Sequence, residues 1–181
     1  MLELLQCTRR YGCPWSYAVP RDAASGGYLR FIQWARENGP WNTRTCIAPA
    51  QAGHLDVLKW VRENGCAWNE ATCSSAAQGG HLSTLKWARV NGCPWDERTC
   101  SSAADEGSLD ILEWARANGC PWDARTCSGA AEGGHLGVLQ WARANGCPWD
   151  GETRRWAAAN HQLDIVDWAI VNGCPPPSEL S

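Results

Sequence analysis

The sequence predicts an all-α solenoid made of stacked helix–turn–helix units, and three observations lead to that prediction. Thirteen Trp stand beside one Phe, three Tyr and one Met in 181 residues, and so skewed a composition indicates a repeated motif. Segments that begin at Gly53, Gly80, Gly107 and Gly134 share one pattern, and each starts 27 residues after the one before it. The apolar residues inside each copy follow the period of a helix.

The repeats extend over nearly the whole chain, because degenerate copies flank these four. Residues 12–15, Gly-Cys-Pro-Trp, match the turn over residues 92–95, which puts Cys7 in the register of the helix Trp and makes the first unit incomplete. We therefore expect one repeat domain over residues 1–174, followed by a C-terminal tail over residues 175–181.

Each unit contains two predicted helices. Residues 55–63 form a helix whose apolar side chains cover an arc of roughly 220°, too wide for a helix that rests on one neighbour. Gly65 ends this helix, since glycine readily adopts the left-handed conformation found at helix ends. A Cys-Pro-Trp turn then leads to a second, shorter helix of small residues, such as residues 72–77. This second helix begins after a polar N-cap residue, which is Asn69, Asp96, Asp123 or Asp150. Neither helix can close a core alone, so neighbouring units must supply the missing contacts.

The unit resembles the ankyrin repeat. Residues 99–104, Thr-Cys-Ser-Ser-Ala-Ala, look like a variant of the family's Thr-Pro-Leu-His-x-Ala-Ala helix start. Residues 80–93 are similar in spacing to the family's second helix and its closing Gly-Ala. The period is shorter than the family's, which is about 33, and this implies that the β-hairpin finger is reduced to a turn or absent. Short, Trp-rich ankyrin-like repeats of this kind occur in large DNA viruses and algae. The resemblance implies a non-catalytic scaffold for protein–protein interaction that uses no cofactor.

Charge and composition exclude several other classes of function. Sixteen Lys and Arg against 19 Asp and Glu give a net charge of −3, which disfavours binding to nucleic acid or to an anionic membrane. No apolar run reaches the roughly 18 residues that a membrane span needs, and Glu3 stands where a signal peptide carries basic residues. We therefore expect an intracellular, most simply a cytoplasmic, protein.

Eleven Cys raise the question of metal or disulfide chemistry. Nine of them form two ladders, one after the Gly of the turn and one in the short helix: Cys66, Cys93, Cys120, Cys147 and Cys174; Cys46, Cys73, Cys100 and Cys127. Successive units lie about 8–10 Å apart, which exceeds the roughly 7 Å between Cα atoms that a disulfide allows, so bridges along a ladder are excluded. A bridge between the ladders, such as Cys93 with Cys100, stays open. The odd total and the small apolar neighbours favour reduced thiols that pack as small hydrophobes.

Other candidate chemistry is better explained by structure. The Cys spacing does not fit a zinc site, and His54, His81 and His135 recur after Gly, where a ring nitrogen can hydrogen-bond a turn. Cys-Pro pairs resemble haem-regulatory dipeptides, but each one occupies the same place in a turn. Every candidate group recurs in register, whereas a catalytic constellation occurs once in a chain. We expect no enzyme activity and no metal ligands.

Two Trp ladders are interpreted as core. One lies on the longer helix and one in the turn, as in Trp87 and Trp95. Arg89 and its equivalents fall at the edge of the buried arc. We expect these guanidinium groups to lie over turn Trp rings or to bond helix-end carbonyls.

The predicted binding surface is the exposed side of the short helices, which faces the concave side if the curvature is ankyrin-like. The residue types at these positions vary between units, and the candidates are Arg44, Ile47, Gln51, Glu70, Ser74, Gln78, Glu97, Arg98, Asp105, Glu106, Arg125, Glu132, Arg155 and Trp156. We name this set the concave stripe. The alternative is that it is only a solvated face.

Trp156 stands outside both Trp ladders, and two roles are open for it. Flanked by Arg155, it has the composition of an interface hot spot. Alternatively, it folds over the end of the solenoid and packs with residues 175–177.

Two other functions remain open. One is a thiol-based metal- or haem-binding protein that uses the Cys ladders. The other is a structural protein that associates end to end with copies of itself, since Val90, Trp168, Ile170 and Val171 could leave an end imperfectly capped. A monomer that binds a protein partner is the expectation we carry forward.

Overall fold

The computed structural model describes residues 18–38 and 42–177, and these residues form twelve helices without a strand. Six helices form an inner row: α2 (Ala18–Ser25), α4 (Arg44–Gln51), α6 (Glu70–Gln78), α8 (Glu97–Asp105), α10 (Ala124–Glu132) and α12 (Gly151–Ala159). Six form an outer row: α3 (Leu29–Asn38), α5 (Leu55–Glu63), α7 (Leu82–Val90), α9 (Leu109–Ala117), α11 (Leu136–Ala144) and α13 (Leu163–Val171). The incomplete first unit with Cys7, the turn residue Trp41 and residues 178–181 of the tail lie outside the described residues.

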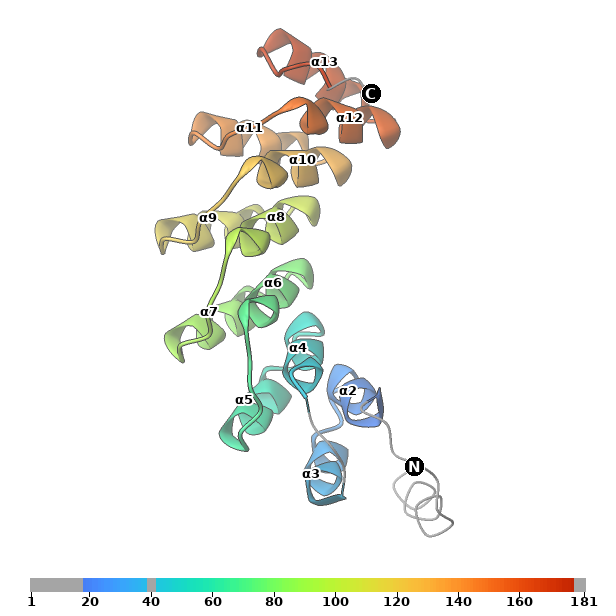
Figure 1. Cartoon of the computed structure of the whole chain (residues 1–181), viewed down its shortest axis with the longest axis vertical. Helices are drawn as coiled ribbons and strands as arrows, with labels where there is room; N and C mark the ends of the chain where they lie inside the picture. The colour runs from blue at the N-terminus through green and yellow to red at the C-terminus, as the bar shows by residue number, and fades with distance from the viewer. Residues whose placement is uncertain (1–17, 39–41, 178–181) are drawn as a thin grey trace.

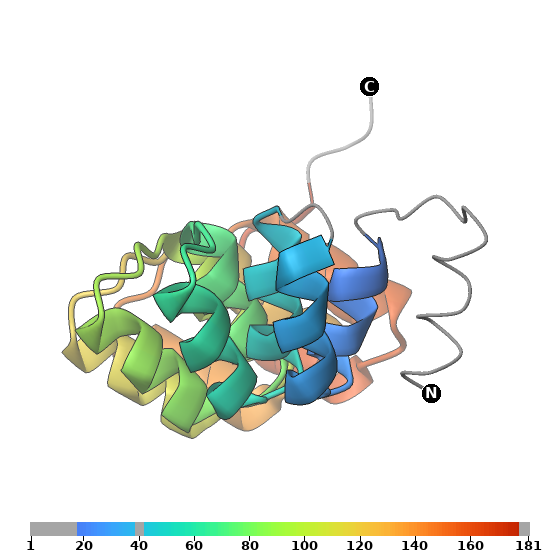
Figure 2. The same ribbon diagram turned by 90° about the horizontal axis from the view of Figure 1, so that it is seen from below.

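The two rows bend into an arc with the inner helices on its concave side (Figure 1). Seen from below, helices of successive units stand side by side in similar orientations (Figure 2). Inner helices of neighbouring units contact one another extensively, whereas outer helices of neighbouring units do so much less. This difference bends the stack toward the inner row.

Side-chain size explains the close approach of the inner helices. Cys73, Ala76 and Ala77 of α6 are fully buried, and their small volumes let α4 and α8 pack closely on either side. The outer helices contribute the larger core residues, such as Leu85 of α7 and Leu112 of α9, which are also fully buried. The all-α solenoid predicted from the sequence is therefore confirmed.

One part of the helix prediction is wrong. The inner helices were expected to be shorter than the outer ones, but α6 and α7 both span nine residues. The sequence predicted a helix over residues 72–77, but α6 begins two residues earlier and ends one residue later. Packing between units, rather than helix propensity, stabilises this longer helix.

The segment between units is a turn and not a β-hairpin finger. The chain leaves α7 through Asn91 and Gly92, and Gly92 adopts a φ of 82° with open space around its Cα. An extended stretch then reaches Asp96, whose carboxylate accepts a hydrogen bond from the backbone N–H of Arg98 at the start of α8. The predicted caps Asp123 and Asp150 make the same bond, while Asn69 occupies the cap position without a side-chain bond.

The Arg and Trp residues of the turn form a repeated cluster. The guanidinium of Arg89 lies 4.1 Å from the ring centroid of Trp95 and donates a 2.7 Å hydrogen bond to the carbonyl oxygen of Cys93. Trp95 packs edge-on against Trp114 of the next unit, with ring centroids 5.8 Å apart. The predicted stack over the turn Trp is confirmed, whereas the hydrogen bond goes to a carbonyl of the turn and not to one at the helix end. The Trp side chains that the structure describes are half-buried at the margin of the core rather than inside it.

The His prediction is wrong. His54, His81 and His135 occupy the residue before each outer helix, and their side chains make no hydrogen bond within the described residues. The ring of His81 instead lies over Gly53 of the preceding unit, so close that a Cβ there would be 2.5 Å from the ring. Gly53 has no Cβ and so leaves room for the ring, and its φ of 75° is one that glycine adopts readily.

Candidate functional site

Helical periodicity puts the concave stripe on one face of the inner row. In α8, Cys100 and Ala104 are fully buried, whereas Ser101 and Asp105 on the other side are partly exposed. Because the units repeat, the same positions of each inner helix form columns that run along the concave side. The last column reads Gln51, Gln78, Asp105 and Glu132.

Every residue of the concave stripe is at least partly exposed, and all but Glu106 lie within inner helices α4 to α12; Glu106 directly follows α8. Arg44, Ile47, Glu70 and Ser74 lie toward the N-terminal half of this face and do not line the hollow described below. In the same half, the side-chain amide of Gln51 donates a 3.4 Å hydrogen bond to Gln78.

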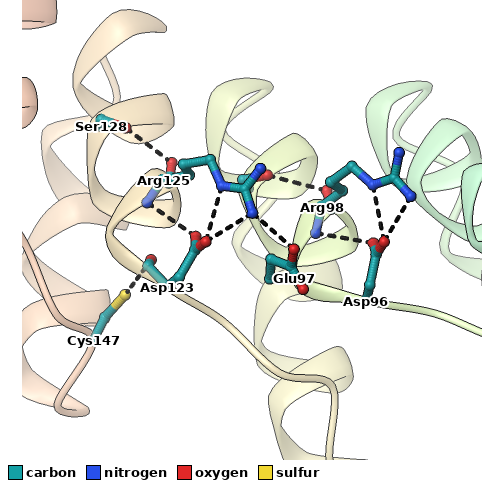
Figure 3. A network of polar contacts seen from close by, with 8 residues as sticks. Asp96, Glu97, Arg98, Asp123, Arg125, Ser128 and Cys147 are labelled. Atoms are coloured by element: carbon teal, nitrogen blue, oxygen red, sulfur yellow. Dashed lines mark hydrogen bonds and ion pairs between the residues drawn. The ribbon is translucent and has the colours of Figure 1, made fainter.

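The helix starts on this face carry a network of ion pairs (Figure 3). Arg98 pairs with Asp96 at 2.7 Å, within one helix cap. Arg125 pairs with Asp123 at 2.8 Å and also with Glu97 of the preceding inner helix at 2.7 Å, so it links two units. Hydrogen bonding to Asp123 raises the pKa of Arg125, and hydrogen bonding to Asp96 raises the pKa of Arg98.

A hollow of about 280 Å³ lies beside this network, between α8, α10 and α12. Its lining combines small residues with charged and aromatic ones: Ser101, Ser102, Asp105, Arg125, Ser128, Gly129, Glu132 and Trp156. Four of the eight belong to the predicted stripe: Asp105, Arg125, Glu132 and Trp156.

Trp156 forms the wall contributed by α12. Its equivalents are Ser102 in α8 and Gly129 in α10, so the hollow arises where a large ring follows two small residues along one column. The guanidinium of Arg155 lies 4.8 Å from the Trp156 ring centroid, and its Nε donates a 2.8 Å hydrogen bond to Glu152. Pro176 and Pro177 lie against Gly151, the first residue of α12, five residues before Trp156.

The hollow carries two free carboxylates. Asp105 and Glu132 make no ion pair or side-chain hydrogen bond in the part of the chain that the structure describes, unlike Glu97, Asp123 and Glu152 nearby. The only basic group in the lining, Arg125, is already engaged by two carboxylates. The hollow can therefore bind a cation, and it offers an aromatic surface for the apolar part of that group.

Sequence reasoning missed the four small residues of the hollow, Ser101, Ser102, Ser128 and Gly129. A signal for two of them was present, since Ser102 and Gly129 are the small equivalents of Trp156 in the preceding units. Where a large residue follows small residues at equivalent positions of successive repeats, the surface is expected to be hollow beside the large side chain.

The described residues contain no group of three or more His, Cys, Asp and Glu side chains arranged to hold a metal ion. Within residues 18–38 and 42–177, none of the helices has the length and apolar character to cross a membrane. The Cys residues do approach one another in pairs, and they are considered separately below.

Comparisons with known proteins support the fold. The sequence matches no protein-family model and no curated protein. The structure is similar to the crystal structure of the human ASB11 ankyrin repeat domain, with a TM-score of 0.63 and 15% sequence identity, over 86% of this chain and 83% of that one. The chain therefore has the architecture of an ankyrin repeat solenoid.

Proposed function

We propose that this chain is a non-catalytic scaffold that binds a protein partner on its concave face, with the hollow between α8, α10 and α12 as the anchoring site. The observation behind the proposal is the pair of free carboxylates, Asp105 and Glu132, facing a hollow walled by Trp156. The ankyrin fold and the variation of this face between units agree with such a role.

The chemistry of the hollow favours a basic partner. A Lys or Arg side chain from an extended segment would neutralise Asp105 and Glu132 and lay its apolar stem along Trp156. Such a contact combines a desolvated charge pair with an aromatic anchor, which is the composition of interface hot spots. The surrounding Ser and Gly residues leave room for the backbone of that segment.

A peptide display selection tests this proposal directly. We expect enriched peptides to contain Lys or Arg and to lose at least about tenfold in affinity for the Asp105→Lys, Glu132→Lys double variant, since each lost charged contact costs roughly 1.5–3 kcal/mol. The matched control is Glu113→Lys, the same change at an exposed position of the outer helix α9. Peptides that bind all three proteins equally would overturn the proposed site.

Trp156→Ser separates anchoring from folding. With Trp156 as an anchor, this variant loses peptide affinity but keeps its melting temperature. A large fall in melting temperature would instead make Trp156 a structural cap. A cytoplasmic location, a monomeric state and a single domain over residues 1–174 remain predictions from the sequence.

A further inference from the structure

Four pairs of Cys recur inside the repeat units. Each pair joins the inner helix of a unit to the turn that follows the outer helix of the same unit, and we call these the cysteine pairs: Cys46 with Cys66, Cys73 with Cys93, Cys100 with Cys120, and Cys127 with Cys147. All eight residues are buried. The two members of a pair are 20 residues apart, so the bridge left open from the sequence, Cys93 with Cys100, has the wrong register.

In the first of these pairs the two sulfur atoms are in contact. Cys46 and Cys66 are joined as a disulfide with their Cα atoms 6.3 Å apart, a separation that suits such a bond. In the equivalent pairs both residues are free thiols, and Cys73 lies close enough to Cys93 for the two thiols to interact. The same placement of two Cys residues thus recurs in four successive units.

The turn Cys of a pair makes a contact that does not involve the Cys of the inner helix. The Cys93 thiol donates to the carbonyl oxygen of Asn69 at 3.5 Å, which ties the end of the unit to the start of its inner helix. Cys174 makes the equivalent bond to Asp150 at 3.3 Å, although Arg154 replaces its partner Cys. A lone turn Cys is therefore sufficient for this contact, which does not require the inner-helix Cys.

In the pair of Cys73 and Cys93 the two thiols differ in acidity. The hydrogen bond from Cys73 lowers the pKa of Cys93, and Arg89 and Arg62 lower it further. The same hydrogen bond, together with burial, raises the pKa of Cys73. The turn Cys of this pair is thus the sulfur that ionises first, and the turn beside it is formed by the exposed residues Asn91 and Gly92.

We propose that the cysteine pairs are dithiol–disulfide sites that exchange with a low-molecular-weight disulfide such as oxidised glutathione. The turn Cys thiolate attacks the glutathione disulfide when the turn opens, forming a mixed disulfide and releasing one reduced glutathione. The inner-helix thiol loses its proton and attacks the protein sulfur of that mixed disulfide, releasing the second glutathione. Each pair loses two hydrogens and two electrons, and one oxidised glutathione becomes two reduced ones.

Oxidation locks each unit without joining it to its neighbours. Each disulfide closes a loop between an inner helix and the turn of the same unit, which restricts the unfolded chain and holds the two helices of the unit together. The concave face changes little in shape, because the sulfur atoms lie on the buried side of the inner helices.

Peptide mapping tests the proposal on the whole chain. The protein is equilibrated in a series of oxidised and reduced glutathione, free thiols are blocked, and tryptic peptides are identified. We expect cross-links between Cys100 and Cys120 and between Cys127 and Cys147, whose peptides are separated by cleavage at Arg116 and Arg143. Since the fold holds the sulfurs together, half-oxidation should occur at a glutathione ratio about tenfold more reducing than for the same chain in denaturant.

Two variants sharpen the result. Cys120→Ser should remove only the cross-link that involves Cys100, while Cys174→Ala should leave every cross-link in place. Recovery of the expected pairs from the unaltered protein does not depend on either variant folding. Cross-links in another register, fully free thiols, or a native chain that oxidises less readily than the denatured one would overturn the proposal and leave the pairs as packing contacts.

Discussion

The Arg89→Met substitution tests whether the Arg–Trp cluster stabilises the solenoid. Arg89 is half-buried, stacks on Trp95 and donates to the Cys93 carbonyl, which lies at the turn joining two units. Methionine keeps most of the apolar stem, so the change removes the cation and its hydrogen bonds rather than the packing.

The expected loss can be worked out from these two contacts. A stacked guanidinium contributes about 0.5–2 kcal/mol, and a hydrogen bond from a charged donor about 1.5–3 kcal/mol. Because Arg89 is partly solvated, the low ends apply, and we expect a loss of about 2 kcal/mol in the free energy of unfolding. For a chain of this length that corresponds to a fall of roughly 4–8 °C in melting temperature.

Urea unfolding of matched variants is the assay. Arg30→Met is the control, since Arg30 is exposed on the outer helix α3 and has neither contact, and it should change stability by less than about 0.5 kcal/mol. A double-mutant cycle with Trp95→Leu should give a coupling energy of about 1 kcal/mol. Equal effects of Arg89→Met and Arg30→Met, or a coupling energy of zero, would refute the reasoning.

Two further predictions concern the ends of helices and are also measured by urea unfolding. Asp123→Ala should lower the free energy of unfolding by about 1 kcal/mol, because it removes the hydrogen bond that caps α10. Asn69→Ala at the equivalent position should lower it much less, since the Asn69 side chain makes no such bond. Equal losses for the two variants would contradict this prediction. Gly53→Ala and Gly65→Ala both place a side chain on a residue with a positive φ, which lowers the free energy of unfolding by about 1–2 kcal/mol each. Gly53→Ala should be the more destabilising of the two, because its Cβ would lie 2.5 Å from the His81 ring. Equal losses for the two Gly variants would show that the ring moves aside freely.

Features that depend on one helix or one turn could be predicted from the sequence. The Asp96 cap and the stack of Arg89 on Trp95 each involve residues within six positions, where the helical period and the turn fix the geometry. The concave stripe also follows from the period, because it needs only the knowledge of which face of each inner helix is apolar.

Features that depend on how helices are offset could not be predicted. Cys93 lies beside Cys73 and not beside Cys100, which is nearer in the sequence. The reason is that α7 runs antiparallel to α6 and ends beside the first turn of α6. His81 packs over Gly53 of the preceding unit for the same kind of reason, and the hollow requires three inner helices in their final spacing. A periodic pattern gives the face of a residue but not its height relative to a neighbouring helix.

The last unit offers a test of these contacts within the chain itself. Ile170 replaces the Arg of the Arg–Trp cluster, and Pro176 replaces the turn Trp, so both members are lost together. The edge-on pair of Trp149 with Trp168 persists, at 5.7 Å between ring centroids, because Trp149 belongs to the turn of the unit before. The Arg and the turn Trp therefore behave as one module that belongs to a single unit, while the Trp–Trp contact belongs to the junction between two units. Trp95 takes part in both contacts, because it stacks with Arg89 of its own unit and packs against Trp114 of the next unit. Arg89→Met should therefore weaken its own unit and also the junction with the next one.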